Sequence, residues 1–298
     1  MTTKESICKF LGLEVSTHLS ALSAESFENI TEIRLRANKP MIIKLAGNTV
    51  MQQTHSFTPT ADDIYETMEC ISRHSFYAFE QELTMGYITL PGGHRVGVAG
   101  QVVIENGTVK TWKYISSINI RIAHSVKGYA DIVLPYILSE SGLNHTMIIS
   151  PPGCGKTTLL RDIVRQISDK GITTGLVDER SEVAGCFQGI PQNDVGICTD
   201  VLDGCPKSIA MLILLRAMSP EVIAVDELGG NDDIAAVDAV LNAGIKLLCT
   251  AHGTGIEDVS ANPTLNKMLK RGIFERFIVI GKNNKVAGIY DRHAQNLL

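Results

Sequence analysis

Two rhythms of apolar and polar positions divide the chain. Up to about Ala123, short stretches such as 33–36 and 94–103 alternate apolar and polar residues, which is typical of half-exposed strands. From Asn144 onward, short continuous apolar runs are separated by longer stretches with helical spacing. That second rhythm is typical of a parallel sheet buried on both faces.

The first rhythm predicts a smaller α+β domain over residues 1–125. Strands are expected at 33–36, 41–45 and 116–123, with a hairpin formed by 86–90 and 94–103. Ile64, Met68 and Ile71 have helical spacing and predict a helix over 61–74.

The second rhythm predicts an α/β domain over residues 144–298, joined to the first by a connector at 126–143. Gly128 and Gly142 act as helix breakers in that connector. The strand candidates of the α/β domain are 146–149, 175–178, 222–226, 246–251 and 277–280.

A glycine-rich loop lies between the first of these strands and a helical pattern. The loop and helix start are Ser150, Pro151, Pro152, Gly153, Cys154, Gly155, Lys156, Thr157 and Thr158. A strand, this loop and a helix together form a phosphate-binding site, because backbone N–H groups and the helix dipole attract anions. We expect Lys156 to reach the β- and γ-phosphates of ATP and the Thr157 hydroxyl to bind Mg²⁺.

One position departs from the usual loop, which begins with glycine where this chain has Ser150. Serine is compatible with that position as long as its backbone angles are ordinary. The two prolines that follow stiffen the loop.

The strand 222–226 ends in two carboxylates, Asp226 and Glu227. Ligands of parallel α/β sheets bind at the carboxyl ends of the strands, where the phosphate loop also begins. Asp226 is therefore a candidate Mg²⁺ ligand, and Glu227 a candidate base that orients and deprotonates the attacking water.

Two further strand ends carry candidate residues. His252 follows the strand 246–251 and could sense the γ-phosphate. Asp178, Glu179 and Arg180 end the strand after the phosphate-loop helix. They either complete the Mg²⁺ network, with Glu179 as a ligand, or form an ion-paired loop.

Composition narrows the classes of protein. The 298 residues carry a net charge of −5, and no basic tail is present, which argues against a dedicated nucleic-acid binder. Seven scattered cysteines without metal-ligand spacing indicate reduced thiols. Residues 1–15 lack the apolar core of a secretory leader, and the most apolar run, 209–215, is too short to span a bilayer.

At this point the chain resembles the stage III sporulation protein AA family, which are ATPases of endospore-forming bacteria. The resemblance extends over nearly the whole length. It rests on residues 32–36 with Pro40, 92–97, 118–123, the phosphate loop with 159–162, 178–185, 189–196, 199–207, 218–220, 226–227 and 250–253.

The resemblance implies a RecA-like P-loop NTPase core related to the type II and type IV secretion ATPases, which are usually hexameric rings. It implies ATP and Mg²⁺ as cofactors, and catalytic roles for Lys156, Glu227 and His252. Arginines of the N-terminal domain approach the phosphates in such rings, so Arg121 and Arg95 become candidates. It also implies a cytoplasmic protein on the mother-cell side, docked on membrane-embedded partners of a channel to the forespore.

Two other classes stay open on the residues alone. RecA-like cores also serve as nucleic-acid-stimulated ATPases or nucleotide-gated nucleic-acid binders. A small-molecule kinase would need an acceptor pocket and a lid, and neither is legible in the sequence.

Overall fold

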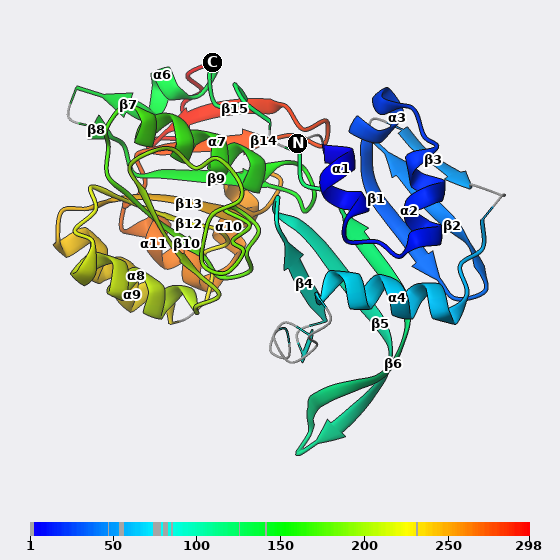
Figure 1. Cartoon of the computed structure of the whole chain (residues 1–298). Coiled ribbons are helices and arrows are strands. Elements are labelled where there is room, and N and C mark those ends of the chain that lie inside the picture. Colours follow the sequence, from blue (N-terminus) through cyan, green and yellow to red (C-terminus); the bar gives the residue numbers. More distant parts are fainter. Residues whose placement is uncertain are drawn as a thin grey trace. The chain divides into compact units, whose positions relative to one another are not determined.

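The computed structural model describes residues 3–46, 48–53, 57–73, 79, 83–84, 86–124, 126–140, 142–230 and 232–298. The chain divides into two compact units, Met1–His124 and Ser125–Leu298 (Figure 1).

The first unit is a six-stranded antiparallel sheet with helices. Its elements are α1 (Thr3–Cys8), α2 (Leu13–Ser20), α3 (Ala24–Glu28), β1 (Ile30–Arg36), β2 (Lys39–Leu45), β3 (Asn48–Gln53), α4 (Ala61–Ile71), β4 (Tyr87–Leu90), β5 (His94–Glu105) and β6 (Thr108–Arg121). The strand order is β3-β2-β1-β6-β5-β4. The strands expected at 33–36, 41–45 and 116–123 and the hairpin of 86–90 with 94–103 are confirmed, with small shifts of their ends.

Local signals explain how α4 begins. The Thr60 hydroxyl accepts a hydrogen bond from the Asp63 amide at 3.2 Å, and the Asp63 carboxylate accepts one from the Thr60 amide at 2.7 Å. This reciprocal capping box satisfies two N–H groups that a helix start leaves unpaired. The helix was expected to reach His74, which lies outside the described residues.

β6 is much longer than its partner on one side. It pairs with β5 along nearly its whole length, whereas β1 pairs only with its last five residues, from Ser117 to Arg121. The outer parts of β5 and β6 therefore form a two-stranded ribbon, which Figure 1 shows extending beyond the sheet.

The second unit is built on a seven-stranded sheet. Its elements are α6 (Leu134–Ile137), β7 (Leu138–Ser139), β8 (Gly142–Leu143), β9 (Thr146–Ser150), α7 (Lys156–Asp169), β10 (Thr174–Asp178), β11 (Thr199–Asp203), α8 (Lys207–Ala217), β12 (Val222–Val225), α9 (Asp233–Asn242), β13 (Lys246–His252), α10 (Ile256–Ala261), α11 (Pro263–Lys270), β14 (Arg276–Ile280) and β15 (Val286–Asp291). The strand order is β11-β10-β12-β13-β9-β14-β15. All five strands expected in this unit are confirmed.

Every strand pair in this sheet is parallel except β14 with β15. Neither β11 nor β15 was expected from the apolar pattern. β11 is the edge strand, and its burial is only partial, so it lacks the continuous apolar run of the inner strands.

Alternate residues of each inner strand enter two separate cores. Ile148, for example, packs in the core that contains α7, whereas Met147 and Ile149 pack in the core that contains α8, α9 and α11. The sheet is thus covered on both faces, which explains its continuous apolar strands. Residues of 126–143, among them Val133 and Ile137, belong to the α7 side of this core.

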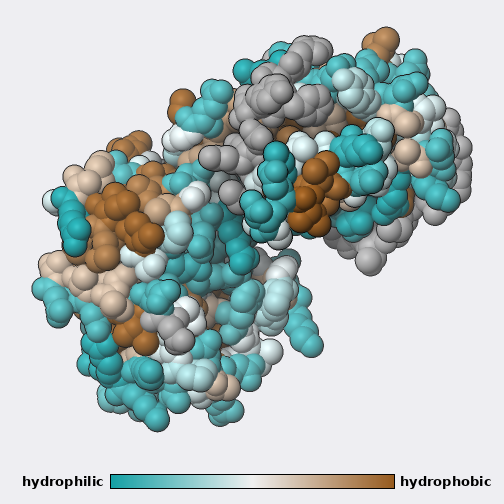
Figure 2. All heavy atoms as spheres, turned by 90° about the horizontal axis from the view of Figure 1, so that it is seen from below, coloured by the Kyte–Doolittle hydropathy of each residue, from teal (hydrophilic) through white to brown (hydrophobic). Residues whose placement is uncertain are grey.

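One helix of this unit carries apolar side chains on its outer face as well. Ile209 and Ile213 of α8, four residues apart, are 53% and 43% exposed, and Met218 just beyond the helix is 45% exposed. In the view from below, apolar residues gather in patches on the surface (Figure 2). None of the helices in the described part of the chain combines the length and the hydropathy needed to cross a membrane.

Candidate active site

Four neighbouring strands of the second unit end at the candidate site. β10, β12, β13 and β9 lie side by side and run parallel. The acidic segment at 178–180, the pair at 226–227, His252 and the phosphate loop follow these four carboxyl ends in turn. The topology therefore collects at one edge of the sheet the groups that are far apart in the sequence.

The phosphate loop has the backbone that its glycines permit. Gly153 and Gly155 have φ angles of +73° and +90°, in the left-handed region that favours glycine. Gly155 directly precedes α7, so the first turn of this 14-residue helix faces the loop. Ser150 is fully buried, keeps a negative φ, and its hydroxyl donates to the Pro151 carbonyl at 2.8 Å. Serine thus replaces glycine here without strain.

Lys156 is directed at the carboxylate pair. Its Nζ donates to Glu227 Oε1 at 2.7 Å, and its side chain is only 9% exposed. Thr157, one residue along α7, donates from its hydroxyl to Asp226 Oδ2 at 2.9 Å. The two residues expected to bind phosphate and Mg²⁺ therefore each contact one carboxylate at the end of β12.

Three cationic or titratable groups surround the Glu227 carboxylate. Besides Lys156, His252 Nε2 lies 2.6 Å from Oε1, and Arg180 Nη1 lies 3.5 Å from Oε2. Burial alone would raise the pKa of Glu227, but the Lys156 ammonium, followed by His252, lowers it to about 2. Glu227 is therefore ionised at neutral pH.

The backbone of Glu227 is unusual and is held at both ends. Its φ of +58° is left-handed, which is uncommon for a residue with a side chain. Its N–H donates to Thr250 Oγ1 at 2.8 Å, and its carbonyl accepts from Lys207 Nζ at 2.8 Å. The Thr250 hydroxyl in turn donates to Asp226 Oδ1.

Asp178 and Glu179 have different surroundings. The Asp178 carboxylate is buried and accepts hydrogen bonds from three backbone amides, those of Glu182, Val183 and Ala184. Burial nevertheless raises its pKa, since desolvation outweighs these bonds. Asp178 therefore holds the turn that follows β10, whereas the Glu179 carboxylate pairs with Lys207 at 2.9 Å.

The donor set fits a nucleotide with its metal better than a metal alone. Among the described residues, no three His, Cys, Asp or Glu side chains gather closely enough to hold an ion by themselves. Protein-bound Mg²⁺ usually keeps several waters and needs only one or two carboxylates besides the substrate phosphates. The Thr157 hydroxyl with the Asp226 carboxylate meets that requirement.

The arginine candidates belong to the first unit. Arg95 and Arg121 are direct partners on β5 and β6, so both side chains lie on the same face of the six-stranded sheet. The Arg95 guanidinium lies over the Tyr87 ring, 4.1 Å from its centroid. Arg34, on the adjacent β1, pairs with Glu32.

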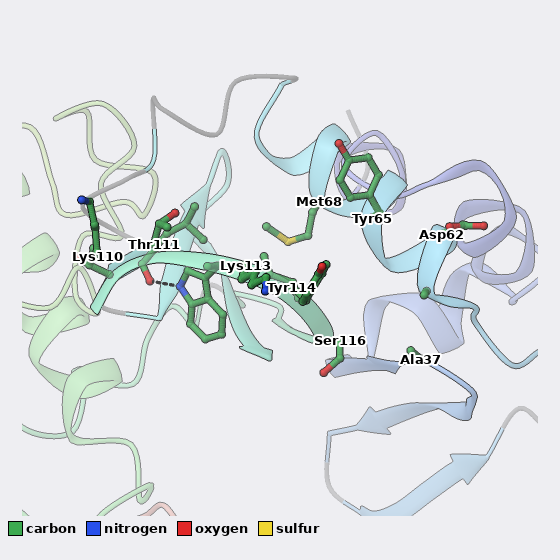
Figure 3. A pocket seen from close by; sticks show the side chains of 14 residues that line it. Ala37, Asp62, Tyr65, Met68, Lys110, Thr111, Lys113, Tyr114 and Ser116 are labelled. Atoms are coloured by element: carbon green, nitrogen blue, oxygen red, sulfur yellow. Dashed lines mark hydrogen bonds between the residues drawn. The ribbon is translucent and has the colours of Figure 1, made fainter. Parts of the chain in front are cut away.

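A large cavity lies in the first unit and has a different character. It measures about 810 Å³ and is lined mainly by α4 and the outer part of β6 (Figure 3). Tyr65, Met68 and Trp112 supply much of its wall, and Trp112 Nε1 donates to the Leu83 carbonyl at 2.6 Å. None of the residues expected to bind ATP lines it.

Sequence reasoning missed Lys207 and Arg161. The Arg161 guanidinium of α7 donates to the carbonyls of Glu182 and Val183 and so supports the turn after β10. Both residues lie in segments on which the family resemblance rests, 159–162 and 199–207, but neither stands at a strand end or in the phosphate loop, so their spacing predicts no role for them. Thr250 stood in a recognised strand end, but its hydrogen bonds were not expected.

Comparison with solved structures defines the class. The ATPase DotB of Legionella pneumophila matches 89% of this chain and 78% of its own, with a TM-score of 0.58 and 15% identity. The pilus retraction motor PilT, solved with bound ADP, matches 85% of this chain and 75% of its own, with a TM-score of 0.55 and 15% identity. The chain thus has the P-loop secretion-ATPase fold, with a parallel-sheet core preceded by a smaller α+β unit.

The family follows from sequence. The model of the family described as sporulation stage III, protein AA, matches residues 1–297. Stage III sporulation protein AA of Bacillus subtilis (strain 168) is 41% identical over 295 residues, which cover 96% of this chain and 94% of that protein. The chain belongs to this sporulation family.

Proposed function

We propose that this protein hydrolyses ATP with Mg²⁺ and powers a membrane-spanning sporulation channel between mother cell and forespore. The observation that carries the enzymatic part is the contact of Lys156 with Glu227 and of Thr157 with Asp226. These contacts bring the loop residues Lys156 and Thr157 to the two carboxylates that follow β12, which supports the roles of phosphate loop, metal-binding pair and carboxylate base. The fold of DotB and PilT and the family membership support the wider role.

The loop residues would bind the triphosphate. The backbone amides of the loop and of the first turn of α7 would accept the phosphates, and Lys156 would exchange its bond to Glu227 for the β- and γ-phosphates. The chemistry that bound Mg²⁺ would supply is positive charge, which stabilises the negative charge that develops on the phosphates. We assign Thr157 and Asp226 to the metal. Glu179, the third ligand expected, would have to leave Lys207 first.

Glu227 would then act on water. A general base works best with a pKa near the operating pH, and a pKa of about 2 makes a weak one. Lys156 is the strongest of the groups that lower it, so its transfer to the phosphates raises the basicity of Glu227 when ATP is bound. His252, 2.6 Å from the same carboxylate, would keep Glu227 oriented and report the state of the γ-phosphate.

The working form would be a homo-oligomer, a hexamer by analogy with secretion ATPases, in the cytoplasm at the mother-cell face of the membrane. Arg121 and Arg95 would supply positive charge to the γ-phosphate, because their planar guanidinium groups donate two hydrogen bonds to phosphate oxygens. Membrane-embedded channel components would be the partners.

The test is phosphate release from ATP by the full chain. We expect release that needs Mg²⁺ and stops in Lys156→Ala, together with weaker ATP binding in a calorimetric titration and an unchanged circular dichroism spectrum, which shows that the variant keeps its fold. Unchanged ATP affinity in Lys156→Ala would contradict the site. A phosphorylated acceptor in place of free phosphate would indicate a kinase, and steep, salt-sensitive stimulation by DNA or RNA would favour the nucleic-acid motor.

A further inference from the structure

Lys207, the first residue of α8, contacts the backbone of the candidate base Glu227. Its side chain is 18% exposed, and Nζ donates to the Glu227 carbonyl at 2.8 Å and pairs with Glu179 Oε2 at 2.9 Å. An ammonium group has three donors and no acceptor, and two of these donors are directed at acceptors that follow two different strands. β10 and β12, which precede Glu179 and Glu227, are neighbours in the sheet.

The carbonyl that Lys207 holds belongs to a strained residue. The φ of +58° at Glu227 persists only where surrounding groups determine it. Thr250 secures the N–H of this residue and Lys207 secures its carbonyl, one from each side. With both backbone groups fixed, the carboxylate has few ways to leave the place where Lys156 and His252 meet it.

We propose that Lys207 is a positioning residue for the ATPase reaction. Through the Glu227 carbonyl it fixes the direction of the catalytic carboxylate, and through Glu179 it joins the ends of β10 and β12 into one unit. This inference rests on the proposed function, in which Glu227 activates water. Lys207 acts through Glu227 and does not itself contact substrate.

The charge of Lys207 also matters for Glu179. That carboxylate pairs with Lys207, whose Nζ also donates to the Glu227 carbonyl, so the Glu179 charge is compensated next to the candidate base. Pairing with Lys207 compensates Glu179 without using Lys156, which is needed for phosphate. Lys207 would thus hold the Glu227 backbone, whereas Lys156 would bind the phosphates of the ligand.

The experiment compares Lys207→Met, Lys207→Arg and Lys246→Met with the unchanged chain. Lys246 is the matched control, since it forms a lysine–glutamate pair with Glu275 at the opposite end of the sheet. We expect Lys207→Met to lower kcat by about 10–100-fold, with the calorimetric Kd for ATP changed less than about threefold. Lys207→Arg should restore part of kcat, and Lys246→Met should leave it unchanged.

A second measurement does not depend on turnover. Amide hydrogen exchange over residues 222–230 should become faster in Lys207→Met, because the Glu227 backbone loses one of its two supports. A wild-type kcat in Lys207→Met would overturn the proposal, as would a loss of ATP binding equal to the loss of kcat. If Lys207→Met does not fold, the same two criteria apply to Lys207→Gln, which keeps a donor but loses the charge.

Failure of the proposed function would look different. In that case the unchanged chain releases no phosphate and the Lys156→Ala control has nothing to abolish. An active wild type with an unaffected Lys207→Met would contradict the role of Lys207 alone.

Discussion

The two ends of the parallel sheet each carry a glutamate surrounded by cations, but the backbone around the two glutamates differs. At the amino end, Glu275 accepts from the His145 amide at 2.9 Å, from Lys246 at 3.2 Å and from Arg292 at 3.3 Å. At the carboxyl end, Glu227 meets Lys156, His252 and Arg180. Both carboxyl groups have a lowered pKa against the effect of burial.

The difference lies in the backbone around them. Glu275 has an ordinary φ, and its bond to the His145 amide ties the starts of β9 and β14 together. Glu227 has a left-handed φ and contacts Lys156, which directly follows Gly155 of the phosphate loop, where Gly153 and Gly155 also have positive φ angles. Similar charges therefore surround a glutamate that links two strands where the backbone is relaxed, and the glutamate that we propose as the catalytic base where the backbone is strained.

The largest loss of kcat should come from substituting an arginine of the first unit. No such arginine role is proposed for the Glu275 end of the sheet. We expect Arg121→Ala to lower kcat by about 10³–10⁵, the range for arginine fingers. Phosphate release measures it. Arg95, the direct cross-strand partner of Arg121 on β5, is the second arginine candidate and is to be substituted next.

Mixing inactive variants shows which subunit the arginine serves. An Arg121→Ala subunit keeps Glu227, and a Glu227→Gln subunit keeps Arg121. Action across a subunit boundary restores some complete sites in a mixed oligomer, whereas action within one subunit restores none. A fully active Arg121→Ala protein would remove this residue from the mechanism and leave a surface ion-pair role, worth roughly 0–1 kcal/mol.

Matched substitutions at the two glutamates test the comparison directly. Glu227→Gln should reduce kcat by about 10²–10⁴ while ATP still binds, because the amide keeps the shape but cannot accept the proton. Glu275→Gln should leave kcat unchanged and cost about 1–3 kcal/mol of unfolding free energy, since it weakens charged hydrogen bonds. Steady-state kinetics and urea unfolding measure both. Equal effects on kcat would show that the two ends do not differ in function.

The smallest effect concerns pH. The pKa of Glu227 is about 2 in the folded chain and 4.5 is its ordinary value, so the unfolded chain takes up the proton first as pH falls. The stabilising contribution is complete above about pH 4.5 and is lost between there and pH 2. Urea unfolding over this range should show a steeper loss of stability in the unchanged chain than in Glu227→Gln. Identical slopes would mean that the Glu227 pairs do not persist in solution.

Much of this arrangement was predictable from the order of the strands. Parallel strands bring their carboxyl ends to one edge, so the phosphate loop, Asp226, Glu227 and His252 were expected together before any distance was known. The parallel α/β class followed from the apolar runs in the same way, whereas the RecA-like core was implied by the family resemblance. The roles of these residues, and of Arg121, stay predictions until they are measured.

Other features depend on tertiary contacts that the spacing of residues along the chain does not predict. The reach of the Lys207 side chain to two strand ends is a property of how α8 packs, and the left-handed φ of Glu227 is imposed by its neighbours. The segment 178–180 was expected either to join the Mg²⁺ network or to form an ion-paired loop. Glu179 and Arg180 do form ion pairs, with Lys207 and Glu227, whereas Asp178 accepts three backbone amides, which no spacing predicts. The edge strand β11 was not predicted, because a partly exposed strand has no continuous apolar run.

The position of β13 between β9 and β12 has a consequence for the order of assembly. Lys156 and Glu227 are separated by 71 residues, and the strand that lies between theirs is translated after both. Contacts of such long sequence separation form late in folding, because the loop must close before they stabilise it. A chain that ends before Lys246 therefore carries the phosphate loop and its carboxylates without the strand that lies between β9 and β12 and sets their spacing.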